Sequence, residues 1–353
     1  VAVHGGWCSA KTQIALLGFV YTGVTSVYHA LHSMAGGIGN RDIVAQAGMW
    51  NHGCMIVVSV LAPVSVNVLG VRANLFVGGI AYLLYNSSLF FAGKLHWMDE
   101  HWIVAGGASL GAGAALFWTA MGVVVTAYPT IQAKGTYFAL FWTIQNVGTM
   151  LACILTFVLN YQTTADSASS STFVVFILMN FVGACICWLM VSERRVIRPD
   201  GSQVHVPERP NISKEFACML SRFFDVRYLA LIPLFLACKY PFTYQFYCFN
   251  KALFTIRTQG LNNVFYYLAQ ALGSVIIGRI MDLQISLRKK GWWTLLTLGA
   301  FSITSWVLSI VANAEYELDK PIALEDQIDF LESRWILPML LYVSWGLSDA
   351  CIQ

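Results

Sequence analysis

Residues 102–127, WIVAGGASLGAGAALFWTAMGVVVTA, contain no Asp, Glu, Lys or Arg. A run of about 20 apolar residues is long enough to cross the hydrocarbon core of a bilayer as an α-helix. The block lacks the period-two alternation of a barrel strand, so a membrane-spanning helix is predicted. Its closely spaced glycines follow no predicted strand and precede no phosphate-binding lysine, which indicates close helix packing rather than nucleotide binding.

The rest of the chain has the same character. Of its 353 residues, 57% are hydrophobic and 11% are charged, whereas about 25% are charged in an average soluble domain. The charges fall between apolar blocks of about 20 residues, so we predict an all-α, polytopic protein surrounded by the lipid bilayer. About ten transmembrane helices are predicted, at residues 12–33, 48–69, 74–93, 102–127, 136–160, 172–192, 227–249, 260–284, 291–312 and 335–353.

The distribution of positive charge predicts the orientation. Lys and Arg near helix ends tend to remain cytoplasmic, and most of those in this chain fall on the side of the amino terminus. We therefore expect a cytoplasmic amino terminus. The layout predicts an amino-terminal six-helix half (1–192), a cytoplasmic linker (193–226) and a carboxyl-terminal half (227–353). Apolar residues at helical spacing predict an amphipathic helix near the end of the linker, and a plain solvated connection is the alternative for its first part.

Several functional classes are not expected. The net charge of +3 is too small to indicate a nucleic-acid partner. The sequence contains no nucleophile-elbow or zinc-protease motif, so an enzyme is not expected. The cysteines are scattered without a Cys-x-x-Cys pair, which argues against a disulfide framework and a zinc site. No cofactor is predicted.

A faint motif occurs after the second and the eighth predicted helix. The stretches PVSVNVLGVR (63–72) and GRIMDLQISLRKK (278–290) each carry a proline or glycine, a polar residue four positions later, and a basic end. An acidic or amide group at a helix end near arginines can hold one conformation of a rocking transporter. We predict a conformational clamp, and positive-inside charges near a helix end are the alternative. The residues are Asn67, Arg72, Gly278, Asp282 and Arg288.

The sequence resembles the uncoordinated-93 branch of the major facilitator superfamily, in the form common in fungi. The resemblance is carried by HALHSMAGGIGN (29–40), NVLGVRANLFVGGIAYLLYNSSL (67–89), LGAGAALFWTAMGVVVTAYPTIQAKGTYFALFW (110–142), YPFTYQFYCFNKALFTIRTQGLNNVFYYLAQALGS (240–274) and WGLSDACIQ (345–353). It implies two six-helix halves around a central path. The chain would then hold ten of an expected twelve helices, with an incomplete carboxyl-terminal half, as in a fragment or the product of a shortened gene.

The resemblance also implies which helices line the path, namely the first, fourth, seventh and tenth. Polar residues inside a membrane are costly and usually face a cavity or a partner. An unpaired lysine at mid-depth costs about 2.5 to 3.5 kcal/mol, so Lys239 is expected to pair with Asp349 across the path. A backbone carbonyl freed by Pro241 is the alternative partner. The predicted substrate-binding residues are Lys239, Tyr244, Gln245, Asp349, His29 and Trp118.

Two classes of function remain open. A secondary transporter would move a small molecule or ion by alternating access, and the site would suit an anionic or zwitterionic ligand with proton coupling through Lys239. A non-transporting accessory membrane protein is the alternative, because the resemblance includes channel regulators and trafficking chaperones. An inactive truncated fragment is a further alternative. The sequence identifies no protein partner, substrate or particular membrane.

Overall fold

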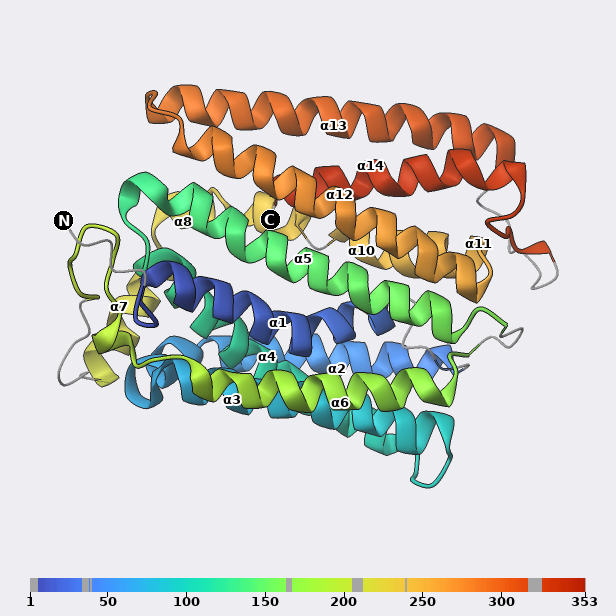
Figure 1. Ribbon diagram of the computed structural model, residues 1–353, viewed down its shortest axis with the longest axis horizontal. Helices are drawn as coiled ribbons and strands as arrows, with labels where there is room; N and C mark the ends of the chain where they lie inside the picture. The colour runs from blue at the N-terminus through green and yellow to red at the C-terminus, as the bar shows by residue number, and fades with distance from the viewer. Residues whose placement is uncertain are drawn as a thin grey trace.

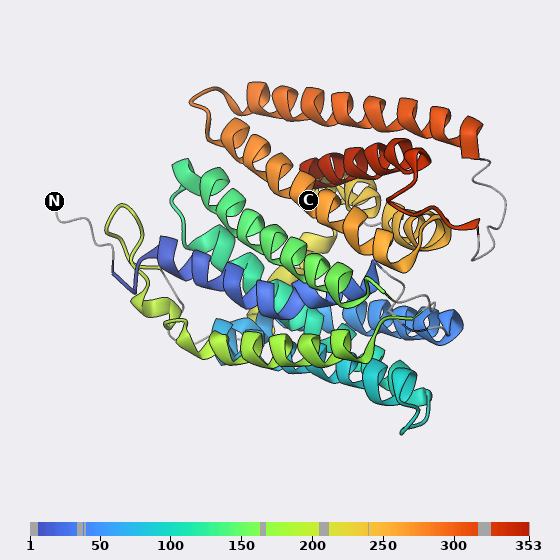
Figure 2. The same ribbon diagram turned by 45° about the vertical axis from the view of Figure 1, so that its right-hand side comes forward.

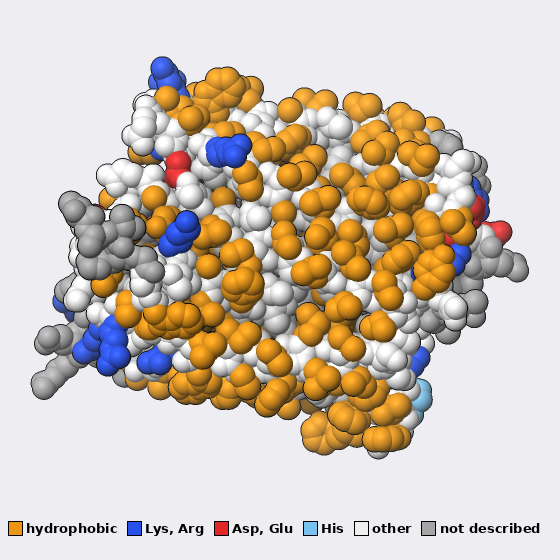
Figure 3. Space-filling model, viewed as in Figure 1, with side chains coloured by type: hydrophobic (Ala, Val, Ile, Leu, Met, Phe, Trp, Pro, Cys, Tyr) orange, Lys and Arg blue, Asp and Glu red, His pale blue; other side chains and the backbone are white. Residues whose placement is uncertain are grey.

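The computed structural model describes residues 6–33, 38, 40–162, 167–204, 212–238, 240–316 and 326–352. Within these ranges the regular structure is helical, and eight helices are long and apolar enough to cross a membrane. Hydrophobic side chains cover the middle of the face shown in Figure 3, while Lys and Arg gather toward its ends. The predicted all-α polytopic fold is confirmed.

The long helices run along the bundle in alternating directions (Figure 1). We call the end where the first helix begins the linker side and the opposite end the far side. The long helices are α1 (Ala10–His32), α2 (Arg41–Ser59), α3 (Ala62–Ser88, extended by the π-helical η2, Leu89–Lys94), α4 (His101–Ala127), α5 (Lys134–Leu159), α6 (Ser170–Ile186), α12 (Ile256–Asp282), α13 (Leu287–Tyr316) and α14 (Ile336–Ile352).

The prediction of one continuous helix over 48–69 is wrong. Helix α2 begins earlier, where the Asn40 side chain accepts a hydrogen bond from the Ile43 amide, and it ends at Ser59. A new helix, α3, starts at Ala62 with Pro63 in its first turn, a position that proline favours because its missing N–H is not needed there. Within α3, Gly70 has φ 82° and joins two helical pieces. This left-handed backbone suits glycine, which has no Cβ.

The predicted continuous helix over 227–249 is also wrong. The segment divides into α8 (Val226–Leu229), α9 (Ile232–Ala237), α10 (Tyr240–Thr243), the π-helical η6 (Tyr244–Asn250) and α11 (Lys251–Leu253). Pro233 and Pro241 each remove a backbone donor from a helical ladder, which favours such breaks. A π-helical turn within a membrane helix often marks a functional position. The preceding linker contains helix α7 (Ile212–Phe223).

Helices α5 and α12 lie side by side in both ribbon views (Figures 1 and 2). Small residues allow their backbones to approach. A Cβ atom on Gly278 would lie 2.5 Å from the Ala139 Cβ, and one on Gly260 would lie 3.2 Å from the Phe157 backbone nitrogen. This contact joins the helices that precede the linker to those that follow it. Helix α13 lies outermost at the edge of the bundle (Figure 1).

Candidate functional site

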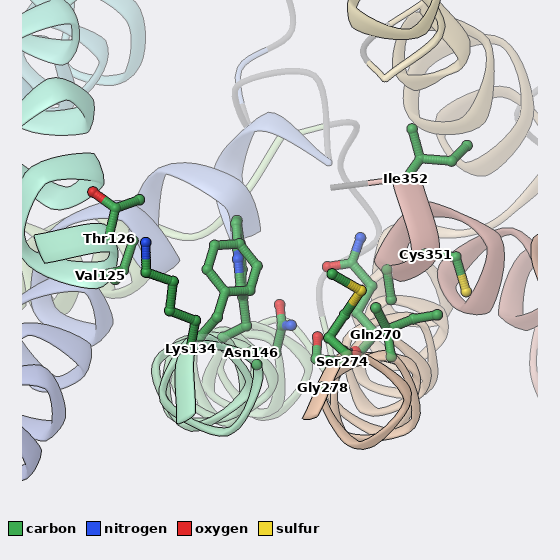
Figure 4. A pocket seen from close by; sticks show the side chains of 15 residues that line it. Val125, Thr126, Lys134, Asn146, Gln270, Ser274, Gly278, Cys351 and Ile352 are labelled. Carbon is green, nitrogen blue, oxygen red and sulfur yellow. Dashed lines mark hydrogen bonds between the residues drawn. The ribbon is translucent and has the colours of Figure 1, made fainter. Parts of the chain in front are cut away.

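A cavity of about 340 Å³ opens beside the contact between α5 and α12 (Figure 4). We call it the linker-side cavity, because it begins at the linker-side ends of these helices. Helices α4 and α14 supply the other walls. Its lining includes Val125, Thr126, Lys134, Phe138, Trp142, Asn146, Gln270, Ser274, Ile277, Met281, Cys351 and Ile352.

Two further cavities continue from it through the bundle. A central cavity of about 20 Å³ shares Trp142 and Gln270 with the linker-side cavity. A third cavity, of about 300 Å³, shares His29 and Trp118 with the central one and is bounded by α2. We call it the α2-side cavity. The three cavities form a series between the helices that precede the linker and those that follow it.

Three buried polar atoms of α5 belong to residues at these cavities and find no hydrogen-bond partner among the described residues. They are Trp142 Nε1, Gln145 Oε1 and Asn146 Oδ1, and their residues line the linker-side or central cavity. Nearly all buried polar groups in proteins are hydrogen-bonded, so an unpaired cluster at a cavity indicates a site for a ligand or water. This cluster is not among the site residues predicted from the sequence. Its signal was a tryptophan followed three residues later by two amides in an apolar helix.

Tyr266 brings two of the predicted site residues together. Its hydroxyl lies within hydrogen-bonding distance of Asp349 Oδ2 and 3.0 Å from Gln245 Oε1, and all three residues are buried. A tyrosine hydroxyl has a single hydrogen to donate. If Asp349 is ionised it takes this hydrogen, whereas a protonated Asp349 donates to Tyr266 and frees the tyrosine hydrogen for Gln245. The arrangement is therefore compatible with both protonation states of the acid.

The other predicted site residues are not all at the cavities. His29 and Trp118 line both the central and the α2-side cavity, and Trp118 Nε1 donates to the Tyr82 hydroxyl at 3.1 Å. Tyr244 instead packs against Trp345 and lines a groove beside α13, so it points away from the central path. Lys239 lies outside the described residues.

The end of α12 binds the start of α5 on the linker side. Asp282 accepts hydrogen bonds from the backbone nitrogens of Gly135, at 2.8 Å, and Thr136, at 2.6 Å, and from the Thr136 hydroxyl. The first amides of a helix lack partners within it, and a negative charge at this end also interacts favourably with the helix dipole. We call these three residues the linker-side clamp.

The remaining motif residues have other surroundings. Gly278 allows the close approach of α5 and α12 described above. Asn67 and Arg288 are exposed, and within the described part of the chain their side chains form no hydrogen bond, nor does that of half-buried Arg72. At the matching motif, which lies within α3 beside the kink at Gly70, Glu193 accepts a hydrogen bond from the Val71 amide. Glu193 is not among the residues predicted from the sequence, since it lies 122 positions from Val71 in the chain.

A buried polar network closes the far side between α1 and the later helices. The Asn263 amide donates to the Ser33 hydroxyl at 2.7 Å, and the Tyr342 hydroxyl donates to Asn263 Oδ1 at 2.7 Å. The Asn262 amide donates to Asn250 Oδ1 at 3.1 Å. We call this network the far-side seal. Its members are Ser33, Asn250, Asn262, Asn263, Trp335 and Tyr342.

An ion pair lies at the rim of the far-side seal. Arg257 donates to both oxygens of Asp329, at 2.7 and 3.0 Å, and its guanidinium lies over the Tyr161 ring at the end of α5. Partial burial raises the pKa of the Asp329 carboxyl, but hydrogen bonds from Arg257 and Thr255 outweigh burial and hold this pKa below its usual value. Because the pKa of Asp329 is lower in the folded than in the unfolded protein, its ionised carboxylate stabilises the fold at pH values above the unfolded pKa. This stabilisation is lost only as the pH falls through the folded pKa. The pair therefore persists at every pH above about 4, the ordinary pKa of an aspartate.

Comparison with known proteins agrees with this architecture. The sequence profile of a family described as ion channel regulatory protein UNC-93 matches residues 46–353. UNC93-like protein 1 of Arabidopsis thaliana is 35% identical over 351 residues, which cover 98% of this chain and 75% of the plant protein. UNC93-like protein C922.05c of Schizosaccharomyces pombe is 28% identical over 98% of this chain and 69% of its own length.

Solved structures give the fold. A crystal structure of the E. coli fucose:proton symporter FucP, in a variant with one substitution, has a TM-score of 0.62 at 13% identity, over 97% of this chain and 82% of that one. At this identity the likeness establishes the helical arrangement alone. The family match and the plant relative carry the assignment further and confirm the resemblance found in the sequence. The chain belongs to the UNC-93 family and has the fold of the major facilitator superfamily.

Proposed function

We propose that the protein is a secondary transporter that moves a small molecule or ion across the membrane by alternating access. One observation carries the proposal: three cavities lie in series between the linker-side clamp and the far-side seal. In alternating access one group of helices rocks against the other around a central site. The linker-side clamp would then break while the far-side seal holds, and the seal would break while the clamp holds.

The proposed clamp consists of Asp282 and the α5 amides, with Gly278 giving the approach it needs. Asn67, Arg72 and Arg288 remain proposed members through their positions in the paired motif. Asp282 is the member that bridges the two groups of helices. Its contact with α5 supports a role in holding the linker side closed.

We further propose Asp349 as the proton-binding group. The contact of its carboxylate with Tyr266, and of Tyr266 with Gln245, supports this role because the set suits both protonation states. A proton-coupled site that pairs Lys239 with Asp349 and binds an anionic or zwitterionic ligand remains the prediction from the sequence, with His29 and Trp118 beside it. Tyr244 is no longer included, since it faces the groove beside α13.

Paired spin labels test alternating access without a known substrate. The nine native cysteines are first replaced. Exposed positions then report on the two ends: Ile131→Cys with Leu287→Cys on the linker side, and Trp97→Cys with Leu331→Cys on the far side. We expect two populated states in which one distance lengthens as the other shortens. A single state with fixed distances, under all conditions that titrate Asp349, would contradict transport.

The proposed orientation gives a second prediction. We propose that the amino terminus and the linker are cytoplasmic, because most positive charges near helix ends are on the linker side. In a cysteine-free background in intact cells, exposed Ser202→Cys should resist a membrane-impermeant maleimide, whereas Leu331→Cys should react. In a protein at the cell surface, the opposite pattern would overturn this orientation. Permeabilised cells, in which both positions should react, provide the control.

An accessory role is the second candidate, because the matched family is described as ion channel regulatory. A regulator would act through its outer faces and linker, and its central cavities would need no reciprocal opening. The spin-label pairs therefore separate the two functions. Saturable uptake into proteoliposomes would favour the transporter independently.

A further inference from the structure

We infer that the linker-side cavity binds a small molecule with an apolar body and an uncharged head group that both donates and accepts hydrogen bonds. The inference rests on the proposed transport function, because the cavity belongs to its series of cavities, and it names the class of ligand that this one cavity binds. It differs from the anionic or zwitterionic ligand predicted for Lys239 and Asp349. The walls described by the structure carry the argument.

The body of the ligand follows from the apolar walls of the cavity. Phe138, Ile277, Met281 and Ile352 belong to these walls. Among the described lining residues Lys134 is the single charged one, and it is exposed at the mouth. A charged group that moved deeper would lose its hydration without a described charged partner, which is strongly unfavourable. The volume of about 340 Å³ falls within the range of small-molecule sites.

The head group follows from the inner end. Asn146 lies twelve positions after Lys134 on α5, which is about 18 Å along a helix. Trp142 Nε1 offers an unpaired donor and Asn146 Oδ1 an unpaired acceptor, and both residues are more than nine-tenths buried. Figure 4 shows the Asn146 and Gln270 side chains on facing helices at the cavity. A primary amide or a hydroxyl would satisfy this set.

The third polar group strengthens the assignment. Gln270 is buried, and its side-chain amide forms no hydrogen bond within the described part of the chain. Nearby polar groups are already occupied within their own helices: the Ser274 hydroxyl donates to the Gln270 carbonyl at 2.8 Å, and the Thr126 hydroxyl donates to the Gly122 carbonyl at 2.6 Å. The unpaired groups are therefore concentrated where α5 faces α12.

A matched set of probes tests this class. Equilibrium dialysis of the full chain in lipid nanodiscs would measure binding of 1-naphthaleneacetamide, its anionic counterpart 1-naphthaleneacetate, and 1-methylnaphthalene, which has no polar head. We expect the amide to bind at least about tenfold more tightly than either of the others, because one or two well-paired hydrogen bonds are worth about that factor.

Variants locate the binding. Asn146→Leu and Gln270→Leu should each weaken amide binding about tenfold and leave methylnaphthalene binding unchanged. Thr156→Val is the matched control on the same helix as Asn146, since Thr156 does not line the cavity and its hydroxyl donates to the Ala152 carbonyl at 3.0 Å, and it should not change binding of any probe. Protection of a lone Cys351 from N-ethylmaleimide by the amide would place the probe in the same cavity.

The outcomes separate this inference from the transport proposal. Equal binding of the three probes, no binding of the amide, or no effect of either leucine variant would overturn the inference. Amide binding with the expected variant effects supports it even if the spin labels report a single fixed state, in which case transport alone is contradicted. Reciprocal label distances without amide binding contradict the ligand class and leave transport standing.

Discussion

Replacing Asp282 with alanine should release the linker-side clamp and shift the protein toward states that are open on the linker side. The change removes two backbone hydrogen bonds, one hydroxyl hydrogen bond and a charge at the start of α5. Loss of a charged capping residue costs about 2 kcal/mol, roughly a 30-fold change in the ratio of closed to open molecules. The Ile131 and Leu287 labels should show a larger population at long distance.

Two further variants separate the clamp from a general effect of charge. Asp282→Asn retains an acceptor without the charge, so about half of the effect is expected. Lys289→Gln, seven positions beyond Asp282 and outside the proposed clamp, changes an exposed side chain without a described hydrogen bond and should alter the ratio by less than about 0.5 kcal/mol. An Asp282→Ala protein with the distances of the parent would show that the clamp does not hold the closed state.

Replacing Asn263 with leucine should have the larger and opposite effect. The substitution removes the acceptor of the buried Tyr342 hydroxyl and the donor to the buried Ser33 hydroxyl, which keeps its bond to the Ala30 carbonyl. Each buried polar group that loses its hydrogen bond costs about 1 to 3 kcal/mol, so we expect about 3 kcal/mol in total, roughly a 100-fold shift. Water can reach these hydroxyls only if the far side opens, and the Trp97 and Leu331 labels should therefore move apart.

A matched buried amide controls for loss of overall stability. Asn180 lies on α6, is fully buried and donates to the α1 carbonyls of Gly23, at 2.9 Å, and Val24, at 3.0 Å. Asn180 also accepts a hydrogen bond from Asn86 on α3. Asn180→Leu should lower thermal stability by a similar amount without changing the far-side distance, since α1, α3 and α6 all precede the linker. If Asn180→Leu and Asn263→Leu open the far side equally, the seal has no specific role.

The contrast between Asn180 and Asn263 shows what could be predicted from the sequence and what could not. The sequence places three amide side chains in one apolar helix, those of Gln259, Asn262 and Asn263. Amides inside a membrane cost free energy, so hydrogen-bonding partners must offset them. The partners, Ser33 and Tyr342, lie 230 and 79 positions away. The sequence of α12 does not show whether these amides bond to helices that precede the linker or to helices that follow it.

Asp282 was predicted as a clamp residue from its position in a repeated motif, and the structure supplied its partners. They are the Thr136 hydroxyl and two backbone amides of α5, and backbone amides carry no side-chain signal in the sequence. The motif's arginines suggested a charge contact, yet Arg288 is exposed and the described contact is with a helix end. Likewise, Tyr266 was not among the predicted site residues, although it joins Gln245 to Asp349.

The sequence by itself determined the membrane environment, the family and the approximate span of most helices. The predicted helix 102–127 corresponds to α4 (His101–Ala127), because a continuous apolar run in a bilayer must satisfy its backbone hydrogen bonds within itself. The tertiary structure alone decided which polar groups meet. Only packing revealed the direction of Tyr244 and the unpaired cluster around Asn146, because each depends on side chains brought from distant helices rather than on local propensity.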